Sequence, residues 1–210
     1  MEVIIKPMSP ELEADYFDFF DHRAFSDGSP YYPCYCNAFN MSAARIHSEI
    51  IEQAEKNGGG IEGFKRALRE SAERMVRQGE IRGYLAYDGG IVVGWCNAND
   101  KRSYYRFGEF DLGNPPPDEA PEEASGTEKI KSVVCFEIAP GYRGKGLASA
   151  LLRRVCEDAA KEGYACVEAY PQRRSQETEL DFTGPIKLYE KAGFILYAQH
   201  GERLTMRKTL

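Results

Sequence analysis

The chain has 210 residues, of which 42% are hydrophobic and 29% are charged, with a formal net charge of −6 and a pI near 5.3. This length and composition are typical of one globular domain, so we expect a single domain over residues 1–210. The acidic balance disfavours nucleic acids and anionic membranes as partners and mildly favours cationic partners such as amines. The N-terminal apolar run is too short for a signal peptide, and no stretch approaches the roughly 20 apolar residues of a membrane span. We therefore expect a cytoplasmic protein, monomeric or homodimeric, without a nucleic-acid or membrane partner.

Hydrophobic spacing and turn residues divide the chain into strands and helices. In chain order, the predicted elements are a strand at 3–8, a helix after Ser9 and Pro10, an irregular segment rich in aromatic rings at 31–39, helices around 42–56 and 61–78, a hairpin at 81–97, a strand that ends at Ile138, a helix from Leu147 to a stop at Gly163, a strand at 165–170, a helix within 184–192, and a last pair of strands at 194–200 and 203–208. The hairpin is predicted from two β-rich runs around an Asp-Gly turn. No internal repeat is visible.

Residues 111–130 interrupt this regular pattern. They contain three consecutive prolines at 115–117 and a run of acidic residues. Such a composition is too proline-rich and too acidic to pack into a core, so we expect a mobile surface insertion. The alternative is a lid over the site, because long loops in compact domains often serve as lids.

The most informative segment is an apolar strand that runs into a glycine-rich basic turn, Arg143-Gly144-Lys145-Gly146, with a helix behind it. The N-terminus of a helix carries unpaired backbone N–H groups and partial positive charge, so a turn that lets a ligand approach there binds phosphate oxygens. Gly144 and Gly146 lack the Cβ atoms that would block the approach, and Arg143 and Lys145 add positive charge. The turn therefore predicts a pyrophosphate site.

Three kinds of phosphate-binding turn could give this pattern. A nucleotide P-loop is excluded, because Ala139 and Gly146 stand where its first Gly and its Ser or Thr would be. A dinucleotide-binding turn keeps two of its three glycines and finds Glu168 where a ribose ligand is expected. However, Ser149 replaces the third glycine, and too little chain follows for a doubly wound domain. A Rossmann-like oxidoreductase is therefore a distant alternative.

The third kind is a turn for the pyrophosphate of an acyl-coenzyme A. The pattern Arg143-x-x-Gly146-x-Ala148, after an apolar strand and Pro140, resembles the acyl-coenzyme A loop of the GNAT N-acetyltransferase superfamily. A second segment, from Gly184 to Phe194 with Leu188-Tyr189-Glu190-Lys191 inside it, resembles the helix and the Gly-Phe pair that close the GNAT site. The two motifs occur in this order with one strand and one loop between them, and the resemblance covers about residues 81–210.

The resemblance implies a mixed α/β fold with a mostly antiparallel central sheet, flanked by helices, in which two parallel strands splay apart around coenzyme A. It implies transfer of an acyl group from acetyl-coenzyme A to an amine of a small molecule or peptide, directly and in a ternary complex. The alternative is an acyl-coenzyme A-binding module of the same fold without transfer activity. The N-terminal helices, about residues 1–80, would form the wall on the acceptor side.

The resemblance also assigns cofactor binding to the end of the strand, to the turn and to the closing helix. The residues concerned are Phe136, Glu137, Ile138, Arg143, Gly144, Lys145, Gly146, Leu147, Ala148, Lys187 and Tyr189.

Acyl transfer to an amine requires a base and an acid. An amine with a pKa near 10.4 must lose a proton at neutral pH, and the departing thiolate needs one. Tyr189 stands at the family's acid position, and its phenol is protonated at neutral pH; the alternative is a helix tyrosine that packs on the sheet. The family often places its base where this chain has Ser132 and Val134, which do not titrate usefully. Glu137 and Glu168 are the remaining candidates for the base, with ordered water as the alternative.

Aromatic rings with a few polar groups are typical of small-molecule pockets and can hold a cation. The candidate acceptor-binding residues are Tyr31, Tyr32, Cys34, Cys36, Trp95 and Asn97, and the alternative for each is ordinary packing. Cys34 and Cys36 have no second Cys or His pair at zinc-ligand spacing, so we expect no metal site.

Overall fold

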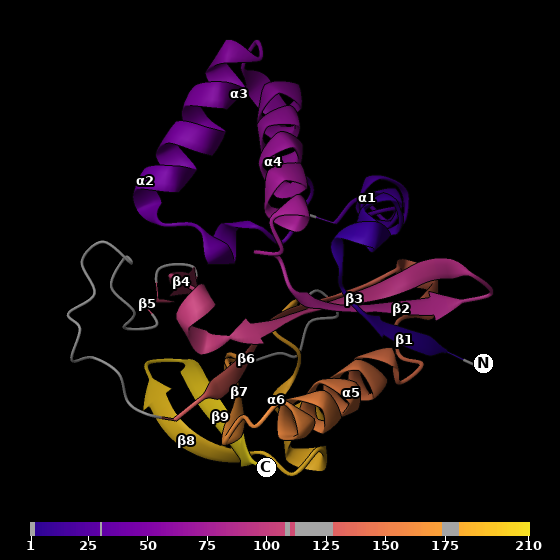
Figure 1. Cartoon of the computed structure of the whole chain (residues 1–210), viewed down its shortest axis with the longest axis vertical. Coiled ribbons are helices and arrows are strands. Elements are labelled where there is room, and N and C mark those ends of the chain that lie inside the picture. The colour runs from indigo at the N-terminus through magenta and orange to yellow at the C-terminus, as the bar shows by residue number, and fades with distance from the viewer. Residues whose placement is uncertain (1–2, 30, 108–109, 112–127, 174–180) are drawn as a thin grey trace.

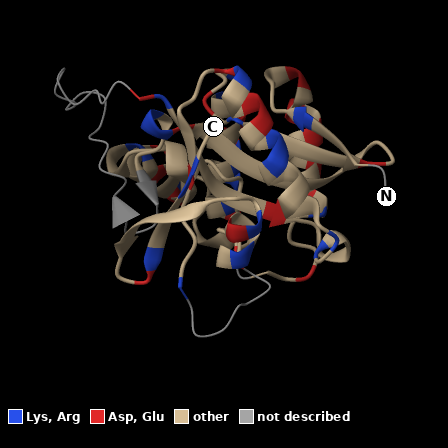
Figure 2. Ribbon diagram, turned by 90° about the horizontal axis from the view of Figure 1, so that it is seen from below, with Lys and Arg blue, Asp and Glu red and all other residues tan. Residues whose placement is uncertain are grey.

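The computed structural model describes residues 3–29, 31–107, 110–111, 128–173 and 181–210. Most of the segment expected to be a mobile insertion, 111–130, lies outside these residues. Within the described part of the chain, no helix is both long enough and apolar enough to cross a lipid bilayer. Figure 2 shows acidic and basic residues interspersed over the ribbon in that view, in keeping with the modest net charge.

The centre of the fold is a seven-stranded sheet with the strand order β1-β2-β3-β6-β7-β9-β8. The strands are β1 (Ile4–Pro7), β2 (Gly83–Asp88), β3 (Ile91–Asp100), β6 (Ile130–Ile138), β7 (Cys166–Ala169), β8 (Ile195–His200) and β9 (Arg203–Thr209), and a separate two-stranded ribbon joins β4 (Arg106–Phe107) to β5 (Phe110–Asp111). Within the large sheet, every neighbouring pair is antiparallel except β6 and β7, which are parallel. The predicted mixed, mostly antiparallel sheet is confirmed.

Helices cover both faces of this sheet (Figure 1). They are α1 (Glu13–His22), α2 (Ala43–Arg45), α3 (Glu52–Lys56), α4 (Gly60–Arg77), α5 (Leu147–Lys161) and α6 (Ile186–Lys191), with a π-helix at Ile46–Ile51 that joins α2 to α3. The helix predicted at 42–56 is therefore one continuous helical stretch with a π-helical middle. The stretch from α2 to α3 packs against α4 as a helical hairpin that projects from the sheet (Figure 1).

Two hydrophobic cores lie on the two faces of the sheet. The first joins α1 and α4 to the sheet and is rich in aromatic rings, among them Tyr16, Phe20 and Trp95. The second joins α5 to the other face through Leu151, Val155 and their neighbours. The apolar residues of α5 recur at helical spacing, so they share the buried side. Each buried Leu or Val contributes about 1.5–3 kcal/mol, which fixes α5 and its N-terminus on the sheet.

The parallel pair β6 and β7 is joined over only part of its length. Its register runs from Ile130 opposite Cys166 to Val133 opposite Ala169, after which β6 continues to Ile138 without β7. Pro171 follows β7 closely and has no N–H to continue the ladder. In place of a β7 partner, the N–H of Phe136 donates to the carbonyl of Phe182 at 2.7 Å. The splayed parallel strands expected from the sequence are present.

Candidate active site

A cleft of about 760 Å³ lies where β6 and β7 separate. Three segments that are distant in the sequence form its walls: the end of β6 with the glycine turn and the start of α5, residues 181–188, and the loop that follows α1. The predicted site residues that line it are Tyr31, Phe136, Glu137, Ile138, Arg143, Gly144, Gly146, Leu147 and Ala148. The fold thus collects most of the predicted cofactor-binding residues in one cavity.

The glycine turn places the N-terminus of α5 at this cleft. Gly144 and Gly146 have φ values of +72° and +82°, and Gly146 is the N-cap residue of α5. A Cβ atom added at either glycine would meet no protein atom within 4 Å, so the space beside them is open. An L side chain would nevertheless be strained at these angles. The first turn of α5 leaves backbone N–H groups without helical partners, and an anion can take them. The turn fits the pyrophosphate of coenzyme A.

Two basic residues predicted for the cofactor do not line the cleft. The ammonium of Lys145 lies 5.2 Å from the centre of the Tyr142 ring. Lys187 is on α6, outside the residues that line the cavity. Neither side chain therefore lines the anion site, to which the backbone of the turn contributes more.

Arg143 begins the turn, but its side chain is directed toward β6 and the loop after α1. Its Nε donates to the carbonyl of Ile138 at 3.0 Å, and its Nη1 donates to Oδ2 of Asp27. Its Nη2 lies 3.5 Å from Oε1 of Glu137. The guanidinium therefore joins the strand, the turn and the loop, whereas the sequence predicted only that it adds charge beside a phosphate.

Glu137 lines the cleft from the end of β6. The residue is 8% exposed, and burial raises its pKa to about 7, because removal from water disfavours the charged form. The neighbouring charge of Arg143 opposes this effect, and the charge of Asp27 reinforces it. A carboxyl group with a pKa near neutrality can both accept and release a proton at physiological pH. Its position and its pKa suit the predicted role of base.

Glu168, the other candidate for the base, is held in an ion-pair network away from the cleft. Its Oε1 accepts from Nε and Nη2 of Arg207 at 2.9 and 2.6 Å, and its Oε2 lies 3.1 Å from Nζ of Lys101. Burial alone would raise the pKa of Glu168, but Arg207 and Lys101 lower it below its usual range. Glu168 therefore stays ionised and ties β7 to β9, and the structure gives it a structural role in place of the catalytic one predicted.

Tyr189 does not line the cleft either. It is fully buried, and burial raises its pKa well above the usual value for a phenol. Its hydroxyl donates to the carbonyl of Thr183. A Cβ atom on Gly184, which does line the cleft, would come within 3.4 Å of this hydroxyl, so the hydroxyl lies directly behind Gly184. The consecutive carbonyls of Phe182 and Thr183 thus accept hydrogen bonds, the first from the Phe136 N–H and the second from the Tyr189 hydroxyl.

The residues predicted for the acceptor pocket divide into two groups. Tyr31 lines the cleft, and its ring meets that of Phe182 edge-on at 5.2 Å. Tyr32 does not line it and lies 5.2 Å from the ammonium of Lys65. Cys34 and Cys36 also lie outside the lining residues, and the N–H of Cys36 donates to Sγ of Cys34 at 3.3 Å. Tyr31 alone stands at the predicted place.

Trp95 and Asn97 belong to the core rather than to the pocket. Trp95 is fully buried on β3 and packs edge-on against Tyr16 at 5.1 Å. The amide of Asn97 donates to the carbonyl of Cys36 at 2.9 Å and accepts from the hydroxyl of Tyr104 at 2.7 Å. Tyr16 of α1 packs on Trp95, and Cys36 and Tyr104 engage the polar groups of Asn97, so neither side chain lines the cleft.

The structure adds site residues that the sequence did not indicate. Asp27 and Ser29 come from the loop after α1, and Asp181 and Phe182 from the segment before α6. None belongs to a motif, and their distance from the turn in sequence hides their proximity. Gly184 begins the closing motif, but the sequence predicted no role for it in the site. Among the described residues, no group of three or more His, Cys, Asp and Glu side chains could hold a metal ion.

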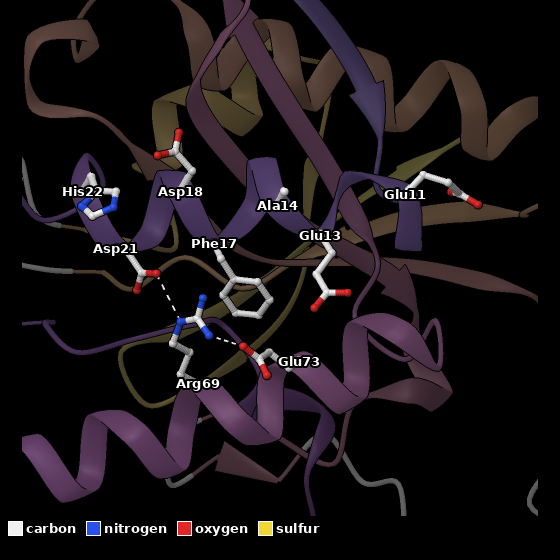
Figure 3. Close-up of a pocket in the computed structure, with 9 residues that line it drawn as sticks. All are labelled: Glu11, Glu13, Ala14, Phe17, Asp18, Asp21, His22, Arg69 and Glu73. Carbon is white, nitrogen blue, oxygen red and sulfur yellow. Dashed lines mark hydrogen bonds and ion pairs between the residues drawn. The ribbon is translucent and has the colours of Figure 1, made fainter.

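A second cavity, of about 510 Å³, lies between α1 and α4 (Figure 3). Five carboxylates line it, but Arg69 crosses it: its Nε donates to Asp21 at 3.2 Å, its Nη1 pairs with Glu73, and its guanidinium lies 4.6 Å from the Phe17 ring. These contacts hold α1 against α4. No residue of the predicted site lies here.

The sheet order, the splayed pair and the glycine turn at a helix N-terminus are the features expected of an acyl-coenzyme A-dependent acyltransferase. The chain belongs to the acetyltransferase (GNAT) family, whose family model matches residues 47–194. It is therefore an N-acetyltransferase, and acetyl-coenzyme A is its acyl donor. These findings confirm the family, the enzyme class and the cofactor expected from the sequence.

Solved structures show the same fold at low sequence identity. The PaiA N-acetyltransferase of Thermoplasma acidophilum, solved in complex with coenzyme A, is 16% identical with a TM-score of 0.50, and the alignment covers 100% of both chains. A GNAT acetyltransferase of Streptococcus pneumoniae is 15% identical with a TM-score of 0.52, over 100% of this chain and 99% of that one. One from Listeria monocytogenes is 12% identical with a TM-score of 0.54, over 100% and 96%. No curated protein matches the chain by sequence.

Proposed function

We propose that this N-acetyltransferase transfers the acetyl group of acetyl-coenzyme A directly to an amine of a small molecule or peptide, with both substrates bound in the cleft. The observation that carries the proposal is that one cavity holds both the glycine turn and Glu137, a buried carboxyl group with a pKa of about 7. The turn accounts for binding of the donor, and the carboxyl group accounts for activation of the acceptor.

The donor would be held mainly by backbone groups. The first turn of α5, with Gly144 and Gly146 in front of it, would bind the pyrophosphate. The end of β6, at Phe136 and Ile138, would contact the thioester arm in the gap that β7 leaves. When bound, acetyl-coenzyme A supplies the activated acyl group, and the residues of the chain supply orientation and proton transfer.

The acceptor amine must lose a proton before it can attack. For an amine with a pKa near 10.4, reaching the neutral form at pH 7 costs about 4.6 kcal/mol. We propose Glu137 as the base, because a carboxyl group with a pKa near the working pH is about half ionised there and is a stronger base than an ordinary carboxylate. The acidic loop residue Asp27 and the ring of Tyr31 lie in the same cleft and suit a cationic amine.

We propose Tyr189 as the proton donor to the departing thiolate. Its raised pKa keeps the phenol protonated, and its hydroxyl lies close to Gly184, which lines the cleft. In the structure this hydroxyl is engaged by the Thr183 carbonyl, so it becomes available when the segment around Gly184 shifts.

The test combines calorimetry with a thiol-release assay over a panel of amines and peptides. The native protein is expected to bind coenzyme A and to release thiol with at least one amine. Glu137→Gln should lower kcat by about 10²–10⁴-fold and leave coenzyme A affinity within about twofold. The matched control is Glu157→Gln on the exposed side of α5, which should change neither quantity. Absence of coenzyme A binding would refute the site, and an unchanged kcat in Glu137→Gln would refute the base.

A further inference from the structure

The guanidinium of Arg143 has three acceptors, two on β6 and one on the loop after α1. Nε donates to the Ile138 carbonyl of β6 at 3.0 Å, Nη1 donates to Oδ2 of Asp27, and Nη2 lies 3.5 Å from Oε1 of Glu137. Of its two carboxylate partners, Arg143 forms a direct hydrogen bond with Asp27 only, because its distance to Glu137 is longer than a normal hydrogen bond. Asp27 therefore holds Arg143 in competition with Glu137.

The surroundings of Asp27 stabilise its negative charge. Partial burial would raise its pKa, but the hydrogen bond and the charge of Arg143 lower it, so Asp27 is ionised at neutral pH. Its second oxygen, Oδ1, accepts from the N–H of Ser29 at 3.3 Å, which fixes the side chain on the loop after α1. The same loop presents Tyr31 to the cleft.

The groups that face Glu137 come from three elements. They are Arg143 on the turn, Asp27, Cys34 and Cys36 on the loop after α1, and Cys135 on β6 itself. Hydrogen bonding between the thiols and burial raise the pKa of Cys34 and of Cys36, so both are neutral at physiological pH. A hydrogen bond from Cys36 lowers the pKa of Cys135, but burial and the neighbouring Cys34 and Glu137 raise it, so Cys135 is neutral as well. Arg143 and Asp27 thus carry the charges that act on Glu137.

We propose that Asp27 is a positioning residue for acetyl transfer: it holds Arg143 away from full pairing with Glu137 and so leaves that carboxylate free to take a proton from the acceptor. The inference rests on the proposed role of Glu137 as base. Asp27 does not touch the reacting atoms. It acts through Arg143, and through the same contact it joins the acceptor-side loop to the first residue of the cofactor turn.

Asp27→Asn tests this with little change of shape. The amide oxygen can still accept from Ser29, but the negative charge is gone, so Arg143 can pair more closely with Glu137. Arg143 already lowers the pKa of Glu137 from 3.5 Å, and Asp27 opposes it. Since one nearby charge shifts the pKa of a carboxyl group by about 1–3 units, loss of the Asp27 charge and closer pairing with Arg143 should lower the pKa of Glu137 by about one further unit. The rising limb of kcat/KM against pH should move to lower pH by the same amount, and the plateau should fall because the base is weaker. Asp27→Glu, which keeps the charge, should keep the midpoint near its native position.

Two readouts separate this proposal from the proposed function. The pKa of Glu137 is measured by ¹³C NMR of its carboxyl carbon in the free protein, with the signal assigned by its loss in Glu137→Gln. The second readout is the pH profile of kcat/KM. A lower pKa in Asp27→Asn with a matching move of the profile supports both ideas. A lower pKa without a move of the profile supports the role of Asp27 toward Arg143 and refutes Glu137 as the base.

An unchanged or higher pKa of Glu137 in Asp27→Asn overturns the proposal whatever the rates are. Asp18→Asn is the matched control, because Asp18 on α1 pairs with Arg23 and does not line the cleft; it should leave both readouts unchanged. If Asp27→Asn fails to fold, Asp27→Ser, which also removes the charge, is measured in its place and must show the same downward move.

Discussion

Replacement of Glu168 by Gln should destabilise the fold without removing the base. The side chain of Glu168 has no exposed surface, and it faces Arg207 and Lys101, whose side chains are 21% and 27% exposed. Gln keeps the shape but removes the charge, and two cations then lose their anionic partner. Breaking a fully buried ion pair costs about 3–5 kcal/mol. Since both cations here retain some contact with water, we expect the free energy of unfolding to fall by about 2–3 kcal/mol at neutral pH.

The pH dependence of this effect has a definite sign. Arg207 and Lys101 lower the pKa of Glu168 below the ordinary value of 4.5, although burial opposes them. The native state therefore binds a proton on this group less readily than the unfolded chain does. Its stabilising contribution is complete above the unfolded value and is lost as the pH falls through the folded value. The stability difference between the wild type and Glu168→Gln should accordingly shrink on acidification below about pH 4.5.

The assay is urea denaturation followed by the fluorescence of Trp95, the only tryptophan of the chain. Curves are recorded for the wild type, Glu168→Gln and the exposed control Glu157→Gln, near neutral pH and at acidic pH. The control should stay within about 0.5 kcal/mol of the wild type. A loss below about 1 kcal/mol for Glu168→Gln, or a loss that grows on acidification, would refute the assigned ion-pair role.

Three further predictions address the cleft and its neighbours. Tyr189→Phe leaves the Thr183 carbonyl without its donor, so the free energy of unfolding should fall by about 1–3 kcal/mol. The kcat should fall as well, whereas the coenzyme A affinity measured by calorimetry should stay nearly intact. An unchanged kcat would show that the hydroxyl has a packing role only. In Gly146→Ala the Cβ would stand in the open space where the ligand approaches, and φ +82° adds a strain of about 1–2 kcal/mol, so coenzyme A binding should be lost. Gly141→Ala, just before the turn and without a positive φ, should bind normally, and equal binding by both variants would contradict the proposed pyrophosphate site. Trp95→Phe should lower the free energy of unfolding by about 1–2 kcal/mol without changing KM for the amine. A raised KM at native stability would show that Trp95 contributes to the acceptor pocket.

The cofactor half of the site could be predicted because its geometry depends on local residue types. Gly144 and Gly146 adopt angles that other residues avoid, and the spacing of leucines in α5 fixes which side of the helix is buried. Both features are visible within about 20 residues of sequence. The order of helices and strands along the chain followed from the same kind of local signal.

The acceptor half could not be predicted in the same way. Glu137 and Glu168 are equivalent in sequence, and what separates them is Arg207, which lies 39 residues beyond Glu168 in the chain. Trp95 and Tyr31 are both aromatic residues near polar ones, and only the placement of α1 over β3 decides which of the two meets the cleft. Long-range contacts of this kind leave no pattern in one sequence.

The hydrogen bonds of the consecutive carbonyls of Phe182 and Thr183 favour a state of the cleft in which this segment is engaged over one in which it is displaced. A donor that takes the Phe136 amide has to displace the Phe182 carbonyl, and the Thr183 carbonyl beside it is linked to the same displacement. Two hydrogen bonds of about 0.5–1.5 kcal/mol each favour the engaged segment by about 1–3 kcal/mol, which lowers the apparent affinity for the donor by roughly 5–150-fold relative to an open cleft. Under the proposed roles of Phe136 and Tyr189, one displacement of this segment would release both the amide that is to receive the donor and the phenol that is to protonate its thiolate, and would couple exposure of the acid to binding of the thioester.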